Sequence, residues 1–181
     1  MKIKTKLTLI FTVIVAIILC CLNVYIYILS YSFTRNNFYN ELKDRANITA
    51  TVFLEADEQS DAVINSFRKK YLRALPQEII RVYNDQNISQ YVEAEGAFDF
   101  QPGLIKKIRK NKEFRFSDGK RQTVGIYYED NQGNFVIIAS AIDEAGIKNL
   151  NVLQFVLIIG FLISIIVLFF AGRFFTKLIL K

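Results

Sequence analysis

Leu7–Leu29, LTLIFTVIVAIILCCLNVYIYIL, runs for 23 residues without an Asp, Glu, Lys or Arg. At about 1.5 Å per residue such a helix is roughly 34 Å long, enough to cross a hydrocarbon core of about 30 Å. A second uncharged stretch, Val152–Gly172 (VLQFVLIIGFLISIIVLFFAG), reaches roughly 31 Å in the same way. Neither stretch has the polar face of a helix that lies on a membrane surface. The sequence therefore predicts two transmembrane helices, at 7–29 and at 152–172.

Charged residues flank these two stretches asymmetrically. Of the 23 basic residues, six lie in the outer flanks, where there is no acid, and the other 17 lie between the stretches with all 17 acids. Since Lys and Arg stay on the cytoplasmic side during insertion, tails 1–6 and 173–181 are predicted to be cytoplasmic and 30–151 extracytoplasmic. The formal net charge of +6 belongs wholly to the tails, so it indicates a lipid bilayer as partner and no nucleic acid. The six flanking residues are Lys2, Lys4, Lys6, Arg173, Lys177 and Lys181.

Cys20 and Cys21 are the only cysteines, and both lie in the first apolar stretch. The external segment 30–151 therefore has no disulfide, although its predicted compartment is oxidising. Its roughly 120 residues are enough for an ordinary apolar core. The first stretch is also longer than the apolar region of a cleaved signal peptide, about 7–15 residues, so we expect it to remain as an anchor.

Three helices are predicted in the external segment. Apolar residues recur at steps of three or four over 34–57, which predicts a helix that continues out of the first span. A second helix is predicted over 61–75, where Pro76 ends it. A third is predicted from Pro102 to Lys110, because proline is favoured in a first helical turn. The apolar stripe of the first helix consists of Phe38, Leu42, Ala46, Thr49, Phe53 and Ala56.

Five further segments are rich in β-branched and aromatic residues and are bounded by turn-forming residues. Asp118-Gly119 is a strong signal for a two-residue hairpin turn, and Asp130–Asn134 (DNQGN) predicts another turn. Tight turns between long strands imply antiparallel pairing, so the predicted class is α+β with a five-stranded antiparallel sheet. The predicted strands are 78–83, 88–92, 113–116, 122–128 and 135–142.

The order of these elements resembles the PAS-like extracytoplasmic sensor fold, called PDC or Cache. The resemblance is carried by Ile79–Tyr83 with the turn at Asp85, by Thr123–Tyr128, and by Gly133 with Phe135–Ala141. It is a resemblance of pattern over most of the chain and contains no single diagnostic motif. It implies a long N-terminal helix packed on a five-stranded antiparallel sheet, with a helical crossover between strands two and three.

The whole layout is similar to the N-terminal half of a bacterial membrane sensor histidine kinase, because Ala171–Lys181 (AGRFFTKLILK) looks like the exit into a HAMP linker. The resemblance implies a homodimer in the plasma (inner) membrane that senses a ligand or protein outside. It also implies a two-component phosphorelay to a response regulator. The HAMP, histidine-bearing and ATP-binding parts would follow Lys181, so ATP and Mg²⁺ are expected only there, and we expect this sequence to be a fragment.

Other kinds of output domain are compatible with the same membrane-anchored sensor. A chemoreceptor or a cyclic-dinucleotide enzyme has a comparable sensor. The alternative from another class is a two-span scaffold or assembly protein whose external domain holds a protein partner. The codons after Lys181 separate these hypotheses, since a HAMP-like segment and a histidine-bearing helix support the kinase, whereas a nearby stop codon supports the scaffold.

The composition argues against catalysis in these residues. The chain has no histidine, which excludes histidine bases, Ser-His and Cys-His dyads and histidine metal sites. It also lacks a phosphate-binding loop and a dinucleotide fingerprint. We expect neither enzymatic activity nor a cofactor here. An acidic group suits either a divalent cation or a polar turn, and no metal site is predicted from it: Glu55, Asp57, Glu58 and Asp61.

In PAS-like sensors the ligand usually lies between the central strands and the crossover segment. Strand alternation places Thr123, Gly125 and Tyr127 on one face, and an arginine holds a carboxylate through two parallel bonds. The alternative interpretation is that Tyr127 packs in the core and the arginines face water. The candidate ligand-binding residues are Arg115, Arg121, Thr123 and Tyr127.

Two features have both a functional and a plainer interpretation. The basic stretch Lys106–Arg115 either attracts an anionic ligand or lipid headgroups, or is a solvated face with Leu104, Ile105 and Ile108 turned inward. Within the spans, the small residues Gly160 and Ser164 and the amide of Asn23 either mediate helix contacts or stand there by chance, without a role in packing.

We expect the helix 34–57 to form much of a parallel homodimer interface.

Overall fold

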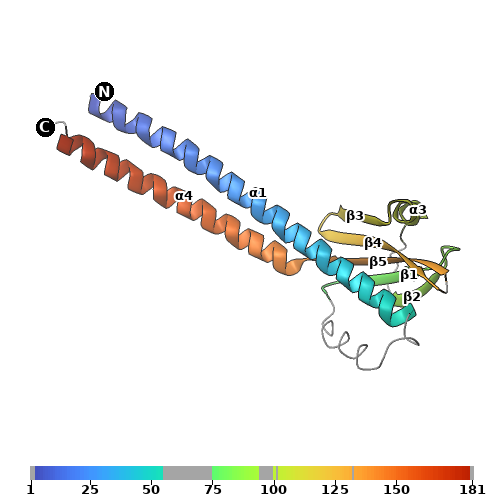
Figure 1. Ribbon diagram of the computed structural model, residues 1–181. Coiled ribbons are helices and arrows are strands. Elements are labelled where there is room, and N and C mark those ends of the chain that lie inside the picture. The colour runs from blue at the N-terminus through green and yellow to red at the C-terminus, as the bar shows by residue number, and fades with distance from the viewer. Residues whose placement is uncertain (1–2, 55–74, 94–99, 101, 132, 180–181) are drawn as a thin grey trace. The chain divides into compact units, whose positions relative to one another are not determined.

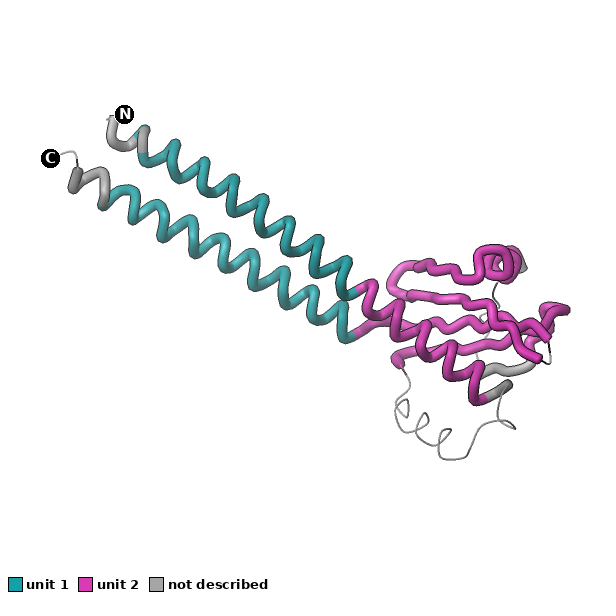
Figure 2. Tube along the Cα trace, in the orientation of Figure 1, with its two compact units in different colours: residues 1–34, 145–181 teal, residues 35–144 magenta. Residues whose placement is uncertain are grey.

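The computed structural model describes residues 3–54, 75–93, 100, 102–131 and 133–179. Within it the chain divides into two compact units (Figure 2). One contains Met1–Thr34 and Ala145–Lys181, and the other contains Arg35–Glu144. The predicted helix 61–75 lies outside the described residues, apart from Leu75, which is not helical.

The first unit contains the first part of one long helix and nearly all of another, which Figure 1 labels α1 and α4. Helix α1 (Ile3–Leu54) has 52 residues and α4 (Glu144–Ile179) has 36. Each contains a stretch long and apolar enough to cross a membrane. Most of the large apolar side chains of these stretches are exposed, as in Phe33 (68%) and Phe155 (64%), so the structure leaves a wide apolar surface on both helices.

The two helices approach closely at Gly172. The hydroxyl of Thr8 donates to the carbonyl oxygen of Gly172 at 3.4 Å, and a Cβ atom on Gly172 would lie 2.8 Å from Thr8 Cγ2. A larger residue at 172 would therefore require the side chain of Thr8 to shift. The pair noted in the sequence behaves differently, because a Cβ on Gly160 would meet nothing within 4 Å and Ser164 bonds to the carbonyl of Gly160 in its own helix. Gly160 and Ser164 thus do not mediate the contact between α1 and α4.

The second unit contains an antiparallel sheet of five strands in the order β2-β1-β5-β4-β3 (Figure 1). Helix α3 (Pro102–Asn111) lies between β2 and β3 in the chain. The predicted α+β class with an antiparallel sheet is confirmed, and the predicted strands agree with the structure to within two residues at each end. The strands are β1 (Ile79–Tyr83), β2 (Ser89–Glu93), β3 (Glu113–Asp118), β4 (Arg121–Asp130) and β5 (Gly133–Ile142).

The β3–β4 hairpin turns one residue later than predicted. Asp118 pairs with Arg121, so the two loop residues are Gly119 and Lys120 instead of Asp118 and Gly119. Gly119 has a φ of 57°. A two-residue hairpin loop needs positive φ at its first position, and glycine adopts this conformation without a steric penalty. The glycine therefore sets the position of the turn, and Asp118 remains in the strand.

Each face of the sheet packs against one helix within this unit. The second half of α1 covers one face and buries Leu42 and Ala46 against Val82, Val124 and Ile137. Phe38, Leu42 and Ala46 confirm the predicted stripe, but Ala50 is buried where Thr49 was expected, and Ala56 lies outside the described residues. Helix α3 covers the other face, with these buried or half-buried residues: Tyr83, Leu104, Ile105, Ile108, Phe114, Tyr127, Val136 and Ile138.

Candidate functional site

Strand β4 presents Arg121, Thr123, Gly125 and Tyr127 on the face of the sheet that α3 covers. Val124 belongs to the opposite core beneath α1, whereas Tyr127 packs with the α3 cluster. Alternation along the strand then assigns the odd-numbered residues to the α3 face. The prediction that Thr123, Gly125 and Tyr127 share a face is confirmed.

A buried pair of hydroxyls links β4 to β5 on this face. Thr123 and Ser140 are opposite each other in the register, 2% and 0% exposed, and their hydroxyl oxygens are 2.8 Å apart. Ser140 also donates to the carbonyl oxygen of Gln122 at 3.3 Å. Thr123 must then be the donor to Ser140, because each hydroxyl has one proton. The pair therefore ties β4 to β5 on the α3 side of the sheet.

Arg121 extends the hydroxyl pair toward the end of the sheet. Its guanidinium donates to the carbonyl oxygen of Gln77 at 2.9 Å, to the Gln77 side-chain oxygen at 3.2 Å and to Ser140 Oγ at 3.4 Å. Gln77 has a φ of 52°, which is uncommon for a residue with a side chain. The amide of Ile142 donates to the carbonyl of Pro76 at 3.0 Å and so holds this turn against the end of β5.

Arg81 adds a second guanidinium to the same face. It lies in the middle of β1 and is 8% exposed. The register pairs Ile79 with Ser140 and Arg81 with Ile138, so Arg81 is the diagonal neighbour of Ser140 across the strands. Sequence reasoning missed Arg81, although a lone arginine inside the strand Ile79–Tyr83 (IIRVY) was a usable signal. Gln77 gave no comparable signal, because its role depends on its contact with Arg121.

We refer to Gln77, Arg81, Arg121, Thr123 and Ser140 as the polar cluster. Guanidinium groups bind carboxylates through paired, charge-assisted hydrogen bonds, and the hydroxyls supply further donors and acceptors. The side-chain oxygen of Gln77 accepts a hydrogen bond from Arg121 within this cluster. Two guanidinium groups beside two hydroxyls give the cluster a chemistry suited to binding a small anion.

Arg115 does not belong to the polar cluster, because the structure places it on the opposite face of the sheet from Arg121 and Thr123. It pairs with Val124, which faces α1, and its Nε donates to Glu113 at 2.6 Å. Its guanidinium lies 5.9 Å from the ring centre of Tyr39 in α1. The hairpin explains why Arg115 faces α1. Its two-residue loop pairs odd-numbered residues of β3 with even-numbered residues of β4, and paired residues share a face. The predicted turn had the same consequence, so the sequence contained the signal.

Tyr127 shares the face but lies apart from the polar cluster. Gly125 separates it from Thr123, and the side chain of Ile108 occupies the space above Gly125. The ring of Tyr127 packs with the α3 core, and Lys112 Nζ lies 3.9 Å from the ring centre. Packing in the core is therefore the observed role of Tyr127. The structure brings together only Arg121 and Thr123 of the four predicted residues.

The basic stretch divides into paired and exposed residues. Arg109 holds the β1–β2 turn, donating to the carbonyl of Asn84 at 2.5 Å and to Asp85 at 3.2 Å. Lys112 pairs with Glu129. Ile105 and Ile108 are buried, as the solvated-face interpretation predicts, whereas Lys106, Lys107 and Lys110 are exposed.

The acidic group at 55–61 lies outside the described residues. In the part of the chain that the structure describes, no three His, Cys, Asp or Glu residues gather in a way that could hold a metal ion.

A row of polar contacts joins α1 to β3 on the α1 face. Arg35 donates to Ser117 at 2.6 Å, and Lys43 donates to Glu113 at 2.5 Å. The hydrogen bond from Lys43 lowers the pKa of Glu113 below 4.5 despite partial burial, and Arg115 lowers it further. The ionised form of Glu113 therefore fastens the long helix to an edge strand.

This row predicts an acid-sensitive component of stability. Because the folded pKa of Glu113 is lowered, its contribution is complete above its unfolded pKa near 4.5 and is lost as the pH falls through the lower folded value. We expect Glu113→Gln to remove this component, with a loss at neutral pH below about 1 kcal/mol since the pair is partly exposed. Urea unfolding of both proteins between pH 2.5 and pH 7 measures it. Parallel pH curves for the two proteins would contradict the assignment.

Comparison with protein-family models, curated proteins and solved structures gives no match to this chain.

Proposed function

We propose that the chain is the input part of a bacterial transmembrane receptor, most simply of a two-component sensor histidine kinase, with the sheet unit as a PAS-like extracytoplasmic sensor. The observation that carries the proposal is the course of α1. One uninterrupted helix supplies a membrane-length apolar stretch and, from Phe38 to Ala50, one wall of the sheet core. A change in packing of that core therefore acts on the same helix that enters the membrane.

Charge supports the direction of signalling across the membrane. The basic tails 1–6 and 173–181 favour the cytoplasm, so the proposal has one end of each span next to a cytoplasmic output. Helix α4 leads from the end of β5 through the second span to Ile179. The chain thus offers two connections, α1 and α4, through which the sheet unit can bias an output domain beyond Lys181.

The polar cluster supplies the signal-dependent element of the proposal. A small carboxylate that replaces the side chain of Gln77 on Arg121 would free a turn whose φ is unfavourable. Because this turn is hydrogen-bonded to Ile142, two residues before α4 begins, ligand binding would alter the start of the second connection. A ligand shifts the receptor only if it binds the two packings unequally. In this proposal ATP, Mg²⁺ and the response regulator are bound by the output domain.

Membrane topology is the first test of the proposal. In a background with Cys20→Ser and Cys21→Ser, single cysteines replace Lys120 in the β3–β4 turn or Lys6 in the N-terminal tail. We expect a membrane-impermeant maleimide to label Lys120→Cys on intact cells and Lys6→Cys only after lysis. Labelling of Lys6→Cys on intact cells would overturn the proposed orientation.

Signal output is the second test. Residues 1–181 are fused to the HAMP and kinase domains of a well-studied receptor, and reporter expression is measured with a panel of small carboxylates and amino acids. We expect a ligand-dependent response that Arg121→Ala abolishes and that Lys110→Ala, an exposed control, preserves. A chimera with correct topology but constant output would favour the two-span scaffold.

A further inference from the structure

The polar side chains of the two apolar stretches differ in whether they have a hydrogen-bond partner. The hydroxyl of Thr8 donates to the carbonyl of Gly172, that of Thr12 to the carbonyl of Thr8 at 2.9 Å, and that of Ser164 to the carbonyl of Gly160 at 2.7 Å. Within the described helices, the side-chain amides of Asn23 and Gln154 have no such partner. A primary amide has two donors and an acceptor, so these two groups carry most of the unmet hydrogen-bonding capacity of the stretches.

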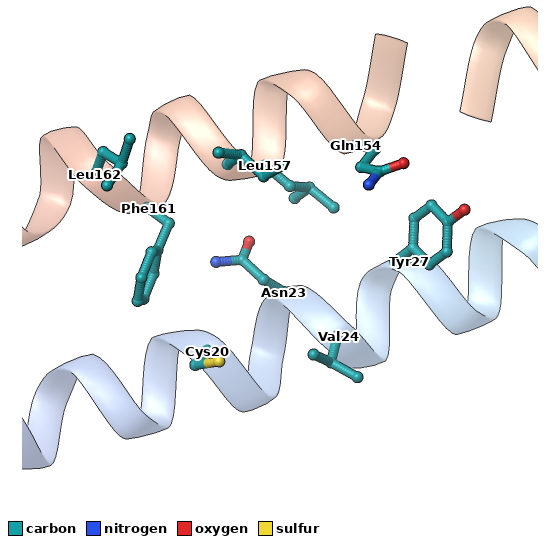
Figure 3. A pocket seen from close by; sticks show the side chains of 9 residues that line it. Cys20, Asn23, Val24, Tyr27, Gln154, Leu157, Phe161 and Leu162 are labelled. Carbon is teal, nitrogen blue, oxygen red and sulfur yellow. The ribbon is translucent and has the colours of Figure 1, made fainter. Parts of the chain in front are cut away.

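Both amides face one open groove between α1 and α4. The groove has a volume of about 340 Å³, and its other lining residues are mainly apolar. Figure 3 shows the side chain of Asn23 reaching from α1 toward α4, and that of Gln154 reaching from α4 into the same space. Asn23 lies six residues before Leu29, the end of the apolar stretch, which corresponds to about 9 Å of depth along a helix.

We infer that a second copy of this chain occupies the groove and that Asn23 pairs with Asn23 of that copy. The inference rests on the proposed function, because it requires the helices to lie in a membrane. Lipid tails offer an amide no hydrogen bond, so the occupant must carry a donor and an acceptor at the depth of Asn23. A second copy meets this requirement automatically, since the same charged tails give both copies the same orientation and depth.

The chemistry of the amide also favours a symmetric pair. Two primary amides related by a two-fold axis along the membrane normal can each donate to the other, so both acceptors and one proton of each are used. Gln154 opens on the same groove and can take up the remaining donors. The dimer predicted from the external helix 34–57 would then have a second, independent contact within the spans.

Self-association of the full chain in lipid vesicles tests this inference. Chains 1–181 carrying a donor or acceptor fluorescent protein at the C-terminus are reconstituted in phosphatidylethanolamine–phosphatidylglycerol vesicles at several protein-to-lipid ratios. We expect Asn23→Leu to weaken association by about 3- to 30-fold, the range typical of a hydrogen bond between membrane helices. Asn23→Gln should retain most of the association, because it keeps the amide.

Ser164→Ala is the matched control. It also removes a polar group from a span, but that hydroxyl is already bonded within its own helix, so association should not change. A wild-type chain that stays monomeric, an Asn23→Leu chain that associates like the wild type, or an equal loss in Ser164→Ala would each overturn the inference.

Disulfide crosslinking tests the geometry without relying on the fold of Asn23→Leu. In a background with Cys20→Ala and Cys21→Ala, Asn23→Cys should form a dimer readily on oxidation. Tyr25→Cys, nearly opposite on α1 and 60% exposed, should do so much less. Equal crosslinking at both positions would refute the pairing. These readouts are independent of kinase output, so a chimera without signal response would reject the proposed function while leaving the Asn23 contact intact.

Discussion

Glu78→Gln is expected to lower the free energy of unfolding by up to about 3–5 kcal/mol, because it removes the buried counter-charge of Arg45 and leaves it with the exposed carboxylate of Glu41, 3.8 Å away. Arg45 of α1 donates to both carboxylate oxygens of Glu78, at 2.9 and 3.0 Å, and the two side chains are only 9% and 8% exposed. Glu78 also accepts a hydrogen bond from the amide of Leu75 at 2.8 Å. The pair therefore joins the long helix to the start of β1, and urea unfolding of the full chain in detergent micelles, followed by near-ultraviolet circular dichroism, measures its loss.

Two variants isolate the cause of that loss. Glu129→Gln breaks an exposed pair with Lys112, whose side chains are 62% and 66% exposed, and should cost less than about 1 kcal/mol. Arg45→Met combined with Glu78→Gln should be more stable than Glu78→Gln alone, because no uncompensated charge is then buried. If Glu78→Gln unfolded at the same urea concentration as Glu129→Gln, water would have to reach the Arg45–Glu78 pair.

Gly125→Ala is expected to destabilise the sheet unit by about 1–3 kcal/mol through overpacking. A Cβ atom at Gly125 would lie 2.1 Å from Cδ1 and 2.6 Å from Cγ1 of Ile108, a fully buried residue of α3 that packs on the sheet. The side chain of Ile108 must then leave its position or α3 must move. The same unfolding measurement gives the size of the effect.

A double-mutant cycle identifies the clash as the cause. Ile108→Ala alone should cost about 2–5 kcal/mol by leaving a cavity, and adding Gly125→Ala to it should cost little more, because the obstructing atoms are gone. Gly103→Ala is the control, since a Cβ there meets nothing within 4 Å and alanine favours the helix α3 by about 0.5–1 kcal/mol. Additive losses in the double variant would show that Ile108 and Gly125 act independently.

The position of Ile108 also bears on where a ligand can bind. In PAS-like sensors the ligand usually lies between the central strands and the crossover segment. Here Ile108 of α3 fills that space at Gly125, and the polar cluster lies further along the sheet, next to the turn at Gln77. The proposed anion site is therefore at Arg121 and away from Tyr127.

The sequence by itself determined the features that depend on neighbours along the chain. Two uncharged helix-length stretches, the excess of basic residues outside them, and strands separated by turn residues are all local patterns. They predicted both long helices, the α+β class and the antiparallel sheet. The pair Asp118-Gly119 predicted the β3–β4 hairpin, but its loop lies one residue later, where Gly119 has a positive φ.

Only the tertiary structure decided which distant residues meet. Arg121 meets Gln77 across 44 positions of sequence, and Arg45 meets Glu78 across 33. Such pairs form because sheet register and helix packing bring together segments whose local sequences carry no information about each other. A pattern with a period of two or 3.6 residues tells which side chains share a face, but the partner on that face is set by folding, when the apolar surfaces of α1, α3 and the sheet are buried together.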